Sequence, residues 1–257
     1  MSSIEEIEEI AVNATENADE FDIIKKNLDE VVRKVEAAKK ARPMGGEVKI
    51  LLATKTVPAE KILFAARELG FSLVGENRVP ELLEKYDDIK GDCDIHLIGH
   101  LQTNKVKNVV GRVSLIESLD SLRLAAEIDR VSALRGVTTD VLVEINIGRE
   151  EAKGGVMPED TAKFFEEIAQ FKNIRPVGIM TMAPKCERKS DYRRYFNKTY
   201  EIFLDISRKY LYNIIEPVLS MGMSDSFEEA VMEGATEVRV GSAVFGSRAY
   251  GLPLTNV

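Results

Sequence analysis

The stretch VKILLATKTVPAEKILFAARELGFSLV, residues 48–74, contains one complete strand–helix–strand unit. Residues 48–53 form a short apolar run that is typical of a buried strand, and Lys55 follows almost directly after it. Pro58 then begins an amphipathic pattern that predicts a helix over 58–69, and residues 72–74 predict a second strand. Two strands joined by a helix in this way are typical of a parallel sheet.

The same alternation of strand and helix continues to the end of the chain. Eight strands are predicted, at 48–53, 72–74, 95–98, 113–116, 139–147, 175–182, 217–221 and 237–240. A helix is predicted after each of them, at 58–69, 77–86, 102–109, 120–134, 158–171, 190–210, 225–233 and briefly after 243. Eight such units in about 210 residues predict an α/β fold, a single (β/α)₈ TIM barrel. A doubly wound open sheet is the alternative, but that fold does not require this even count.

The first forty residues have a helical pattern without strands. Isoleucines at positions 4, 7 and 10 share one face, and the amphipathic spacing resumes from Phe21 to Val35 after a polar break near Asn17 to Asp19. Pro43 and the two glycines after Met44 end the pattern. We therefore expect an N-terminal helical extension over 1–44 and a barrel over 45–257, together forming one structural domain.

The composition narrows the classes of function. A net charge of −8 and a pI near 5.1 argue against nucleic acid as a partner, because nucleic-acid-binding proteins usually carry a basic surface. The sequence has no apolar stretch near the ~18 residues that span a bilayer, and its acidic start does not resemble a signal peptide. Two scattered cysteines predict neither disulfides nor a zinc site. We expect a cytoplasmic protein with reduced thiols, no membrane partner and no metal.

Polar and small residues gather where the predicted strands end. Lys55 follows the first strand, Asn77 follows the second and Asn146 ends the fifth. The seventh strand ends in SMGMS, residues 220–224, and the eighth in RVGSAVFG, residues 239–246. Because TIM barrels carry their chemistry on the loops at this end of the strands, the pattern predicts a ligand site in the mouth of the barrel.

The last two strand ends predict a phosphate site. Barrel folds often bind phosphate between these two loops and the N-terminus of a short helix. Gly222 and Gly241 would let backbone N–H groups approach an anion, while Ser220 and Ser242 offer hydroxyl groups. Ordinary turn chemistry at strand–helix junctions is the alternative explanation for these pairs.

Lys55 and Arg239 would add two cations to the same mouth. A desolvated lysine can form a Schiff base with a carbonyl compound, and a phosphate-bearing carbonyl is either pyridoxal 5′-phosphate or a sugar phosphate. Arg239 shares its strand face with Gly241 by the alternation of side chains along a strand. The alternatives are a lysine that extends into water and an arginine that pairs with a buried carboxylate.

Seven segments together resemble one family over nearly everything after residue 27. They are LLATKTVPAEKI, GENRVPELLEK, HLIGHLQTNKVK, IESLDSLRLA, VLVEINIGREEAKGGV, GIMTMAP and LSMGMSDSFEEAVMEGATEVRVGSAVFGSR. With these segments the chain resembles the YggS/PROSC family of pyridoxal phosphate-binding proteins, which share the barrel of the alanine racemase N-terminal domain. The resemblance implies that Lys55 forms the internal aldimine with pyridoxal 5′-phosphate. It also implies that Ser220, Gly241 and Ser242 hold the phosphate, that Arg239 faces the pyridine nitrogen, and that Asn77 and Met221 are further pocket residues.

The resemblance favours a cofactor-holding protein over an enzyme. An arginine beside the pyridine nitrogen disfavours the ring proton that makes the cofactor a strong electron sink. Alanine racemases take their second base, a tyrosine, from a C-terminal β-domain, and a chain that ends at Val257 is expected to lack it. We therefore expect a protein of intracellular pyridoxal phosphate homeostasis or delivery, monomeric, with apo pyridoxal phosphate enzymes as its recipients, and no robust catalysis.

Two alternatives are enzymes. One is a pyridoxal phosphate-dependent amino-acid racemase that uses a local base such as His100 or Tyr250. The other is a class I aldolase-like lyase, in which Lys55 attacks a sugar phosphate directly and no cofactor takes part.

Overall fold

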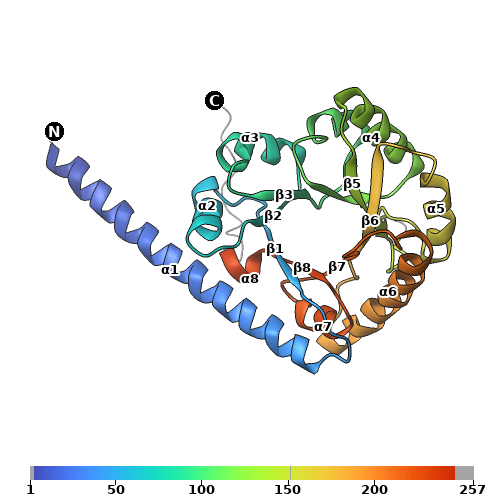
Figure 1. The fold of residues 1–257 in the computed structure, drawn as a ribbon. Helices are drawn as coiled ribbons and strands as arrows, with labels where there is room; N and C mark the ends of the chain where they lie inside the picture. The colour runs from blue at the N-terminus through green and yellow to red at the C-terminus, as the bar shows by residue number, and fades with distance from the viewer. Residues whose placement is uncertain (1–2, 151, 247–257) are drawn as a thin grey trace.

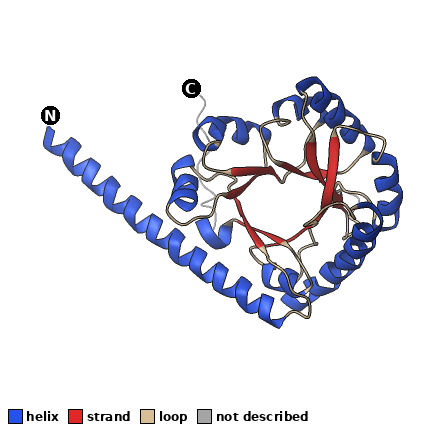
Figure 2. Cartoon of the chain, viewed as in Figure 1, coloured by secondary structure: helices blue, strands red, loops and turns tan. Residues whose placement is uncertain are grey.

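A computed structural model describes residues 3–150 and 152–246, with side chains from residue 19 onward. Within these residues eight parallel strands pair in chain order, and the last strand pairs with the first to close a barrel. Helices surround the ring of strands on its outside (Figure 2). The predicted TIM barrel is confirmed, and the open sheet is excluded by the pairing that closes the ring.

The strands of the barrel lie close to their predicted positions. They are β1 Lys49–Ala53, β2 Leu73–Glu76, β3 Asp94–Leu97, β4 Leu115–Leu119, β5 Thr139–Ile145, β6 Ile174–Thr181, β7 Val218–Met223 and β8 Glu237–Val240. The largest difference is in β4, which was predicted over 113–116. Its second half contains Glu117 and Ser118, two fully buried polar residues that interrupt the apolar run expected of a core strand.

The helices also follow the prediction. They are α1 Ser3–Ala41, α2 Ala59–Arg67, α3 Val79–Ile89, α4 Leu122–Arg135, α5 Thr161–Ile168, α6 Lys189–Tyr210, α7 Phe227–Met232 and α8 Ser242–Phe245. Two 3₁₀ helices, η1 Thr103–Asn108 and η2 Pro158–Asp160, join them. The third crossover is therefore a 3₁₀ helix instead of the expected α-helix.

The N-terminal extension is one continuous helix. The polar break in the pattern near residues 17–19 does not interrupt it, because α1 runs from Ser3 to Ala41. Asparagine, alanine and aspartate change the exposed face of a helix, but only proline or glycine would be expected to end it. The second half of α1 lies along α7 and α8, while its first half extends beyond the barrel (Figure 1).

The barrel has a large apolar layer outside its strands and a polar group inside them. Side chains that point outward from the strands pack against the helices in one continuous cluster. A smaller apolar cluster of Leu115, Leu142, Val177 and Met180 stands apart from that layer. Polar residues that are buried on the inner faces of the strands include His96, Glu117, Ser220, Glu237 and Arg239. Among the described helices, none has the length and apolar character needed to cross a bilayer.

Candidate functional site

The end of β1 and the end of β8 lie side by side in the barrel mouth, which we define as the C-terminal end of the strands. The two strands pair with Leu52 opposite Val240, so Lys55 and Gly241 both follow within a few residues of this pair. A Cβ atom on Gly241 would lie 2.9 Å from the backbone oxygen of Ala53. Glycine is therefore required for this close approach, which brings the two predicted site residues onto neighbouring strand ends.

Lys55 is half-buried at the entrance of the mouth. By the alternation of the strand it shares the inner face of the barrel with Leu51 and Ala53. Its Nζ makes no hydrogen bond or ion pair with any residue in the described part of the chain.

Two backbone amides converge on one oxygen atom beside this strand end. The N–H groups of Gly241 and Ala243 both donate to Oγ of Ser224, at 3.1 and 3.2 Å. Ser224 lies just after β7, whereas Ala243 is in the first turn of α8. Ser242, between the two amides, is exposed at the start of α8. We name Ser224, Gly241, Ser242 and Ala243 the amide cradle; an anionic oxygen could accept the same two N–H groups.

Ser224 is the residue of the cradle that sequence reasoning missed. The motif SMGMS offered two serines, and the prediction chose Ser220, the one inside the strand. The register of β7 and β8 places Ser220 opposite Glu237, one layer deeper than the strand ends. Ser220 is therefore not brought together with Gly241 and Ser242, and Ser224 lies with them instead. The two serines differ in their position on β7: Ser220 lies within the strand, whereas Ser224 directly follows it.

Gly222 and Met221 shape the end of β7 without pointing a side chain into the mouth. Gly222 has φ +93°, and a Cβ atom there would lie 2.5 Å from Cβ of Ala230 in α7. Only glycine allows this backbone conformation together with such close packing. Met221 is fully buried in the apolar layer between the strands and the helices.

Arg239 is held inside the barrel by three groups. Its Nη1 donates to Oγ of Ser220 at 2.6 Å, and its Nη2 donates to the backbone oxygen of Thr181 at 2.8 Å. Nη1 also lies 3.8 Å from Oε2 of Glu117. The alternative reading, an arginine paired with a buried carboxylate, is thus observed. The guanidinium is 4% exposed, so it forms a fixed cation beneath the mouth.

Ser220 also contacts two buried carboxylates, and this requires a proton on one of them. Its Oγ lies 2.7 Å from Oε2 of Glu117 and 2.8 Å from Oε1 of Glu237. A hydroxyl donates only one hydrogen, so one carboxyl must donate in return. Burial first, and then the nearby charge of Glu117, raise the pKa of Glu237 to about 8. We therefore assign the proton to Glu237.

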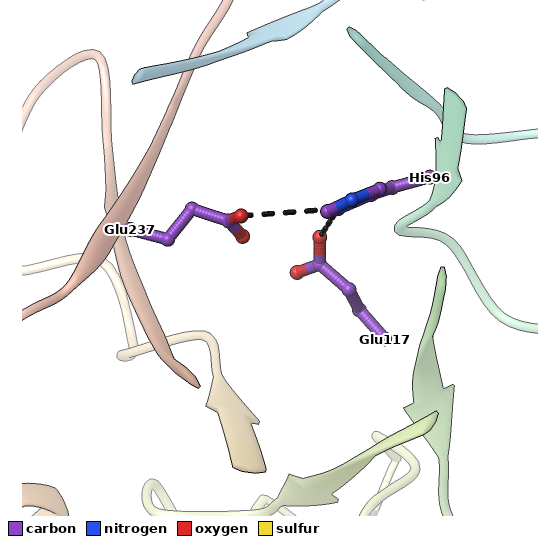
Figure 3. A group of neighbouring side chains, drawn as sticks. All are labelled: His96, Glu117 and Glu237. Atoms are coloured by element: carbon purple, nitrogen blue, oxygen red, sulfur yellow. Dashed lines mark hydrogen bonds and ion pairs between the residues drawn. The ribbon is translucent and has the colours of Figure 1, made fainter. Parts of the chain in front are cut away.

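His96 completes this group from β3 (Figure 3). Its Nδ1 lies 2.8 Å from Oε1 of Glu117 and 3.8 Å from Oε2 of Glu237. Burial lowers the pKa of His96, but the hydrogen bond to Glu117 and the neighbouring acidic groups more than offset this, and the net direction is upward. Burial also opposes the charge of Glu117, yet contacts with His96 and Arg239 lower its pKa overall. The group therefore places the imidazole of His96 and the guanidinium of Arg239 against one carboxylate and one neutral carboxyl.

The same three side chains are the described residues with metal-ligand geometry. One ligand atom from each of His96, Glu117 and Glu237 lies within 4.8 Å of the others. However, a divalent cation there would sit close to the guanidinium of Arg239 and would have to displace the proton of Glu237. We therefore describe the group as a proton-sharing cluster.

Two asparagines at the strand ends have different surroundings. Asn77 is half-buried, and its backbone oxygen would lie 2.0 Å from a Cβ on Gly99, so the second and third strand ends pack closely. The side chain of Asn146 makes its hydrogen bonds within its own loop. Its Oδ1 accepts from the backbone amide of Glu150, and its Nδ2 donates to the backbone oxygen of Glu150. Asn77 thus remains a candidate pocket residue.

The candidate bases of the racemase alternative are His100 and Tyr250, and His100 is the one that lies within the described residues. His100 is 64% exposed, and its Nδ1 lies 3.3 Å from Oδ2 of Asp120. Glu144 is buried on the inner face of β5, where burial and then the charge of Asp120 raise its pKa. Tyr250 lies outside the described residues.

Two open grooves, of about 320 and 400 Å³, lie at the opposite end of the barrel. They are lined by residues around the first positions of the strands, among them Lys49, Leu73 and Thr139. In TIM barrels this end serves stability and the mouth serves chemistry. We therefore place the site at the amide cradle.

Fold and site together define a TIM-barrel protein with a lysine on the first strand end and an amide cradle on the last two. The alanine racemase N-terminal domain family matches residues 20–249. A pyridoxal phosphate homeostasis protein of Aquifex aeolicus is 46% identical over 203 residues, which cover 79% of this chain and 88% of that protein. The chain therefore belongs to the family of pyridoxal phosphate homeostasis proteins, which have the alanine racemase N-terminal fold. The resemblance seen in the sequence is confirmed.

Two solved structures extend the comparison. PipY of Synechococcus elongatus, solved with pyridoxal phosphate bound, has a TM-score of 0.73 and 27% identity, and the match covers 87% of this chain and all of PipY. An alanine racemase of Clostridium difficile has a TM-score of 0.64 at 16% identity, which shows a shared fold alone. The match covers 89% of this chain and 60% of the racemase.

Proposed function

We propose that this chain binds pyridoxal 5′-phosphate as a Schiff base on Lys55 and serves the homeostasis or delivery of the cofactor in the cell. The observation that carries the proposal is the pair of amides, Gly241 and Ala243, that converge beside the strand end bearing Lys55. The relatives named for pyridoxal phosphate homeostasis and the cofactor-bound structure of PipY support it.

The chemistry of the donor set fits a phosphate-bearing aldehyde. Backbone amides and hydroxyls of the cradle suit phosphate oxygens, and an amine that has no partner among residues 3–150 and 152–246 suits an aldehyde. In this proposal Ser224, Gly241 and Ser242 hold the phosphate and Gly222 shapes the loop beside them. When bound, the cofactor supplies an electrophilic carbonyl carbon and an electron-withdrawing ring.

The remaining predicted pocket residues have narrower roles in the proposal. Asn77 lines the pocket, and Met221 contributes through its backbone, because its side chain lies in the apolar layer. Arg239 faces the pyridine nitrogen and keeps it unprotonated, while Ser220 contributes by orienting that guanidinium.

We also propose that the chain has no robust catalytic activity. A cation near the ring nitrogen disfavours the protonated ring that stabilises carbanions. The amino-acid racemase alternative needs a second base, and the described candidate, His100, is exposed and paired with Asp120. Apo pyridoxal phosphate enzymes as recipients, a cytoplasmic location and a monomeric state are parts of the same proposal. So is the division into an extension, 1–44, and a barrel, 45–257, within one structural domain.

Reconstitution with the cofactor tests the Schiff base. Purified chain mixed with pyridoxal 5′-phosphate should develop visible absorption, and borohydride reduction should fix the cofactor to Lys55, as located by peptide mass spectrometry. Lys55→Ala should abolish both signals. Lys90→Ala is the matched control, because Lys90 is exposed and pairs with Asp87 on the surface. A chain that stays colourless would contradict the proposal and favour the lyase alternative.

Exchange of α-protons separates a carrier from a racemase. Cofactor-loaded chain incubated with single amino acids in deuterated water should show no exchange above that of free cofactor. Exchange at an enzymatic rate with any amino acid, lost in His100→Ala, would overturn the non-catalytic part of the proposal and leave cofactor binding intact.

A further inference from the structure

The backbone around Lys55 is held from outside the barrel by side chains of α3. Strand alternation sends Lys55 toward the mouth and its neighbour Thr54 toward the helices. Two residues of α3, Glu81 and Lys85, lie one turn apart on one face of that helix and both reach this segment. Lys85 contacts Thr54, the residue before Lys55, and Glu81 contacts Thr56, the residue after it.

Lys85 holds the N-terminal side through a buried ion pair. Its Nζ donates to the backbone oxygen of Thr54 at 2.8 Å and to Oε1 of Glu76 at 2.7 Å. The hydroxyl of Thr54 donates to the same Oε1 at 2.6 Å. The side chain of Glu76 is fully buried and that of Lys85 is 12% exposed. Hydrogen bonds to charged groups in a buried site are stronger than ordinary ones, so this group fixes the backbone of Thr54 firmly.

Glu81 holds the C-terminal side at a strained residue. Thr56 has φ +62°, a left-handed conformation that is uncommon for a β-branched side chain. Its amide donates to Oε2 of Glu81 at 3.0 Å, and its hydroxyl donates to the backbone oxygen of Lys55 at 2.6 Å. Strain of this kind persists where the surroundings determine the conformation, and it is common at functional sites.

We propose that Thr54, Glu76, Lys85 and Glu81 are positioning residues that keep the amine of Lys55 in the mouth in the geometry for Schiff-base formation. In that reaction the neutral amine of Lys55 bonds through Nζ to the aldehyde carbon. The bond from that carbon to the aldehyde oxygen breaks, and the oxygen leaves as water with the two hydrogens of the amine. This inference rests on the proposed function. It adds four residues outside the mouth on which the reaction depends.

The contacts predict which step the positioning residues control. None of the four is part of the amide cradle, so the phosphate should bind without them. A lysine whose backbone is released samples many orientations, and only a fraction of them brings Nζ to the aldehyde. Loss of a positioning contact should therefore slow the covalent step and leave the non-covalent step unchanged.

Two ligands separate the steps. The 4′-deoxy analogue of pyridoxal phosphate, which has no aldehyde, reports non-covalent binding by quenching of the intrinsic tyrosine fluorescence. Pyridoxal 5′-phosphate reports Schiff-base formation by stopped-flow absorption. In Thr54→Val the analogue should bind as in the wild type, while Schiff-base formation slows about tenfold, the size expected for losing a hydrogen bond to a buried charge. Thr54→Ser keeps the hydroxyl and should restore the rate.

A second variant guards against the possibility that a change in the buried group of Thr54, Glu76 and Lys85 disturbs folding. Glu81 is partly exposed, so Glu81→Ala should fold normally and still slow the covalent step, because it removes the oxygen that accepts from the amide of Thr56. Glu84→Ala, at an exposed position on the same helix, is the matched control and should leave the rate unchanged. Circular dichroism would check the fold of each variant.

The outcomes distinguish the two proposals. If the wild type forms the Schiff base and both Thr54→Val and Glu81→Ala form it equally fast, the positioning role is overturned and cofactor binding stands. Equal weakening of analogue binding and of the covalent step would also overturn it, because it would indicate a general loss of structure. If the wild type itself binds the analogue but never forms the Schiff base, the proposed function fails.

Discussion

At the scale of single residues, Ser220 connects most of the buried charge inside the barrel. Its hydroxyl contacts Glu117, Glu237 and Arg239, and a proton on one of the two carboxyls, which the raised pKa assigns to Glu237, satisfies all three contacts. Removing either carboxyl would leave an unpaired charge or donor in a buried site, which is costly. The cluster therefore fixes the orientation of Arg239, although it lies beneath the proposed cofactor site.

Glu237 makes stability depend on pH. Its pKa is about 8 in the folded chain against an ordinary value of 4.5, so between these values the folded chain holds a proton that the unfolded chain has lost. The free energy of unfolding should therefore fall as pH rises from about 5 to 8, by at least ~1 kcal/mol. The pKa of His96 is also raised, so the free energy of unfolding should fall further as pH rises above 6.5, the ordinary pKa of histidine.

Urea unfolding at several pH values tests this dependence. Glu237→Gln keeps a donor for Ser220 and has no titrating proton, so its free energy of unfolding should be flatter between pH 5 and 8. Glu84→Gln, an exposed control, should retain the wild-type slope. Identical slopes for wild type and Glu237→Gln would show that Glu237 is ionised in the folded chain.

At the scale of elements, the mouth depends on how closely the strand ends approach each other. Gly241 meets Ala53 between β8 and β1, and Gly99 meets Asn77 between β3 and β2. Each glycine lies where a Cβ would collide with backbone atoms, which cannot move without moving a strand end. The positions of Lys55 and Asn77 are thus set partly by residues that have no side chain.

Gly99→Ala tests this dependence. The new Cβ would lie 2.0 Å from the backbone oxygen of Asn77, so we expect a loss of about 2 kcal/mol or more in the free energy of unfolding, as for other overpacked sites. Gly91→Ala is the control, because no atom lies within 4 Å of its added Cβ. Chemical denaturation of the two variants measures the difference, and equal stability would mean that the strand ends separate without cost.

At the scale of the whole molecule, α1 stabilises the part of the barrel that carries the amide cradle. Its buried face lies along α7 and α8, and Nδ2 of Asn27 donates to the backbone oxygen of Val244 at 3.0 Å. At its end, the guanidinium of Arg42 donates to the backbone oxygens of Ala235 and Gly45. The extension therefore supports the last strands and α8.

Leu28 and Ile23 on α1 allow a matched comparison. Leu28 is 1% exposed against the barrel, so Leu28→Ala should lower the free energy of unfolding by about 3 kcal/mol, through lost burial and a cavity. Ile23 is 55% exposed on the same helix, and Ile23→Ala should change it by less than about 1 kcal/mol. If thermal unfolding gives the same loss of unfolding free energy for Leu28→Ala and Ile23→Ala, the stability of the barrel does not depend on α1.

The sequence by itself determined the barrel and the position of each strand within a few residues. It also determined that Lys55 lies at the same end of the barrel as the ends of the last two strands. These follow from local periodicity and from the rule that parallel strands present their ends on one side. The family relation followed from the motifs alone.

Only the tertiary structure decided which side chains meet. It placed Ser220 with Glu117 and Glu237, put Ser224 in the amide cradle, and joined Lys85 to Thr54. These contacts depend on strand register and on closure of the ring, and they join residues distant in sequence. Hydrophobic periodicity reports only which face of a segment is buried, so it carries no information about the partner that a buried polar group finds there.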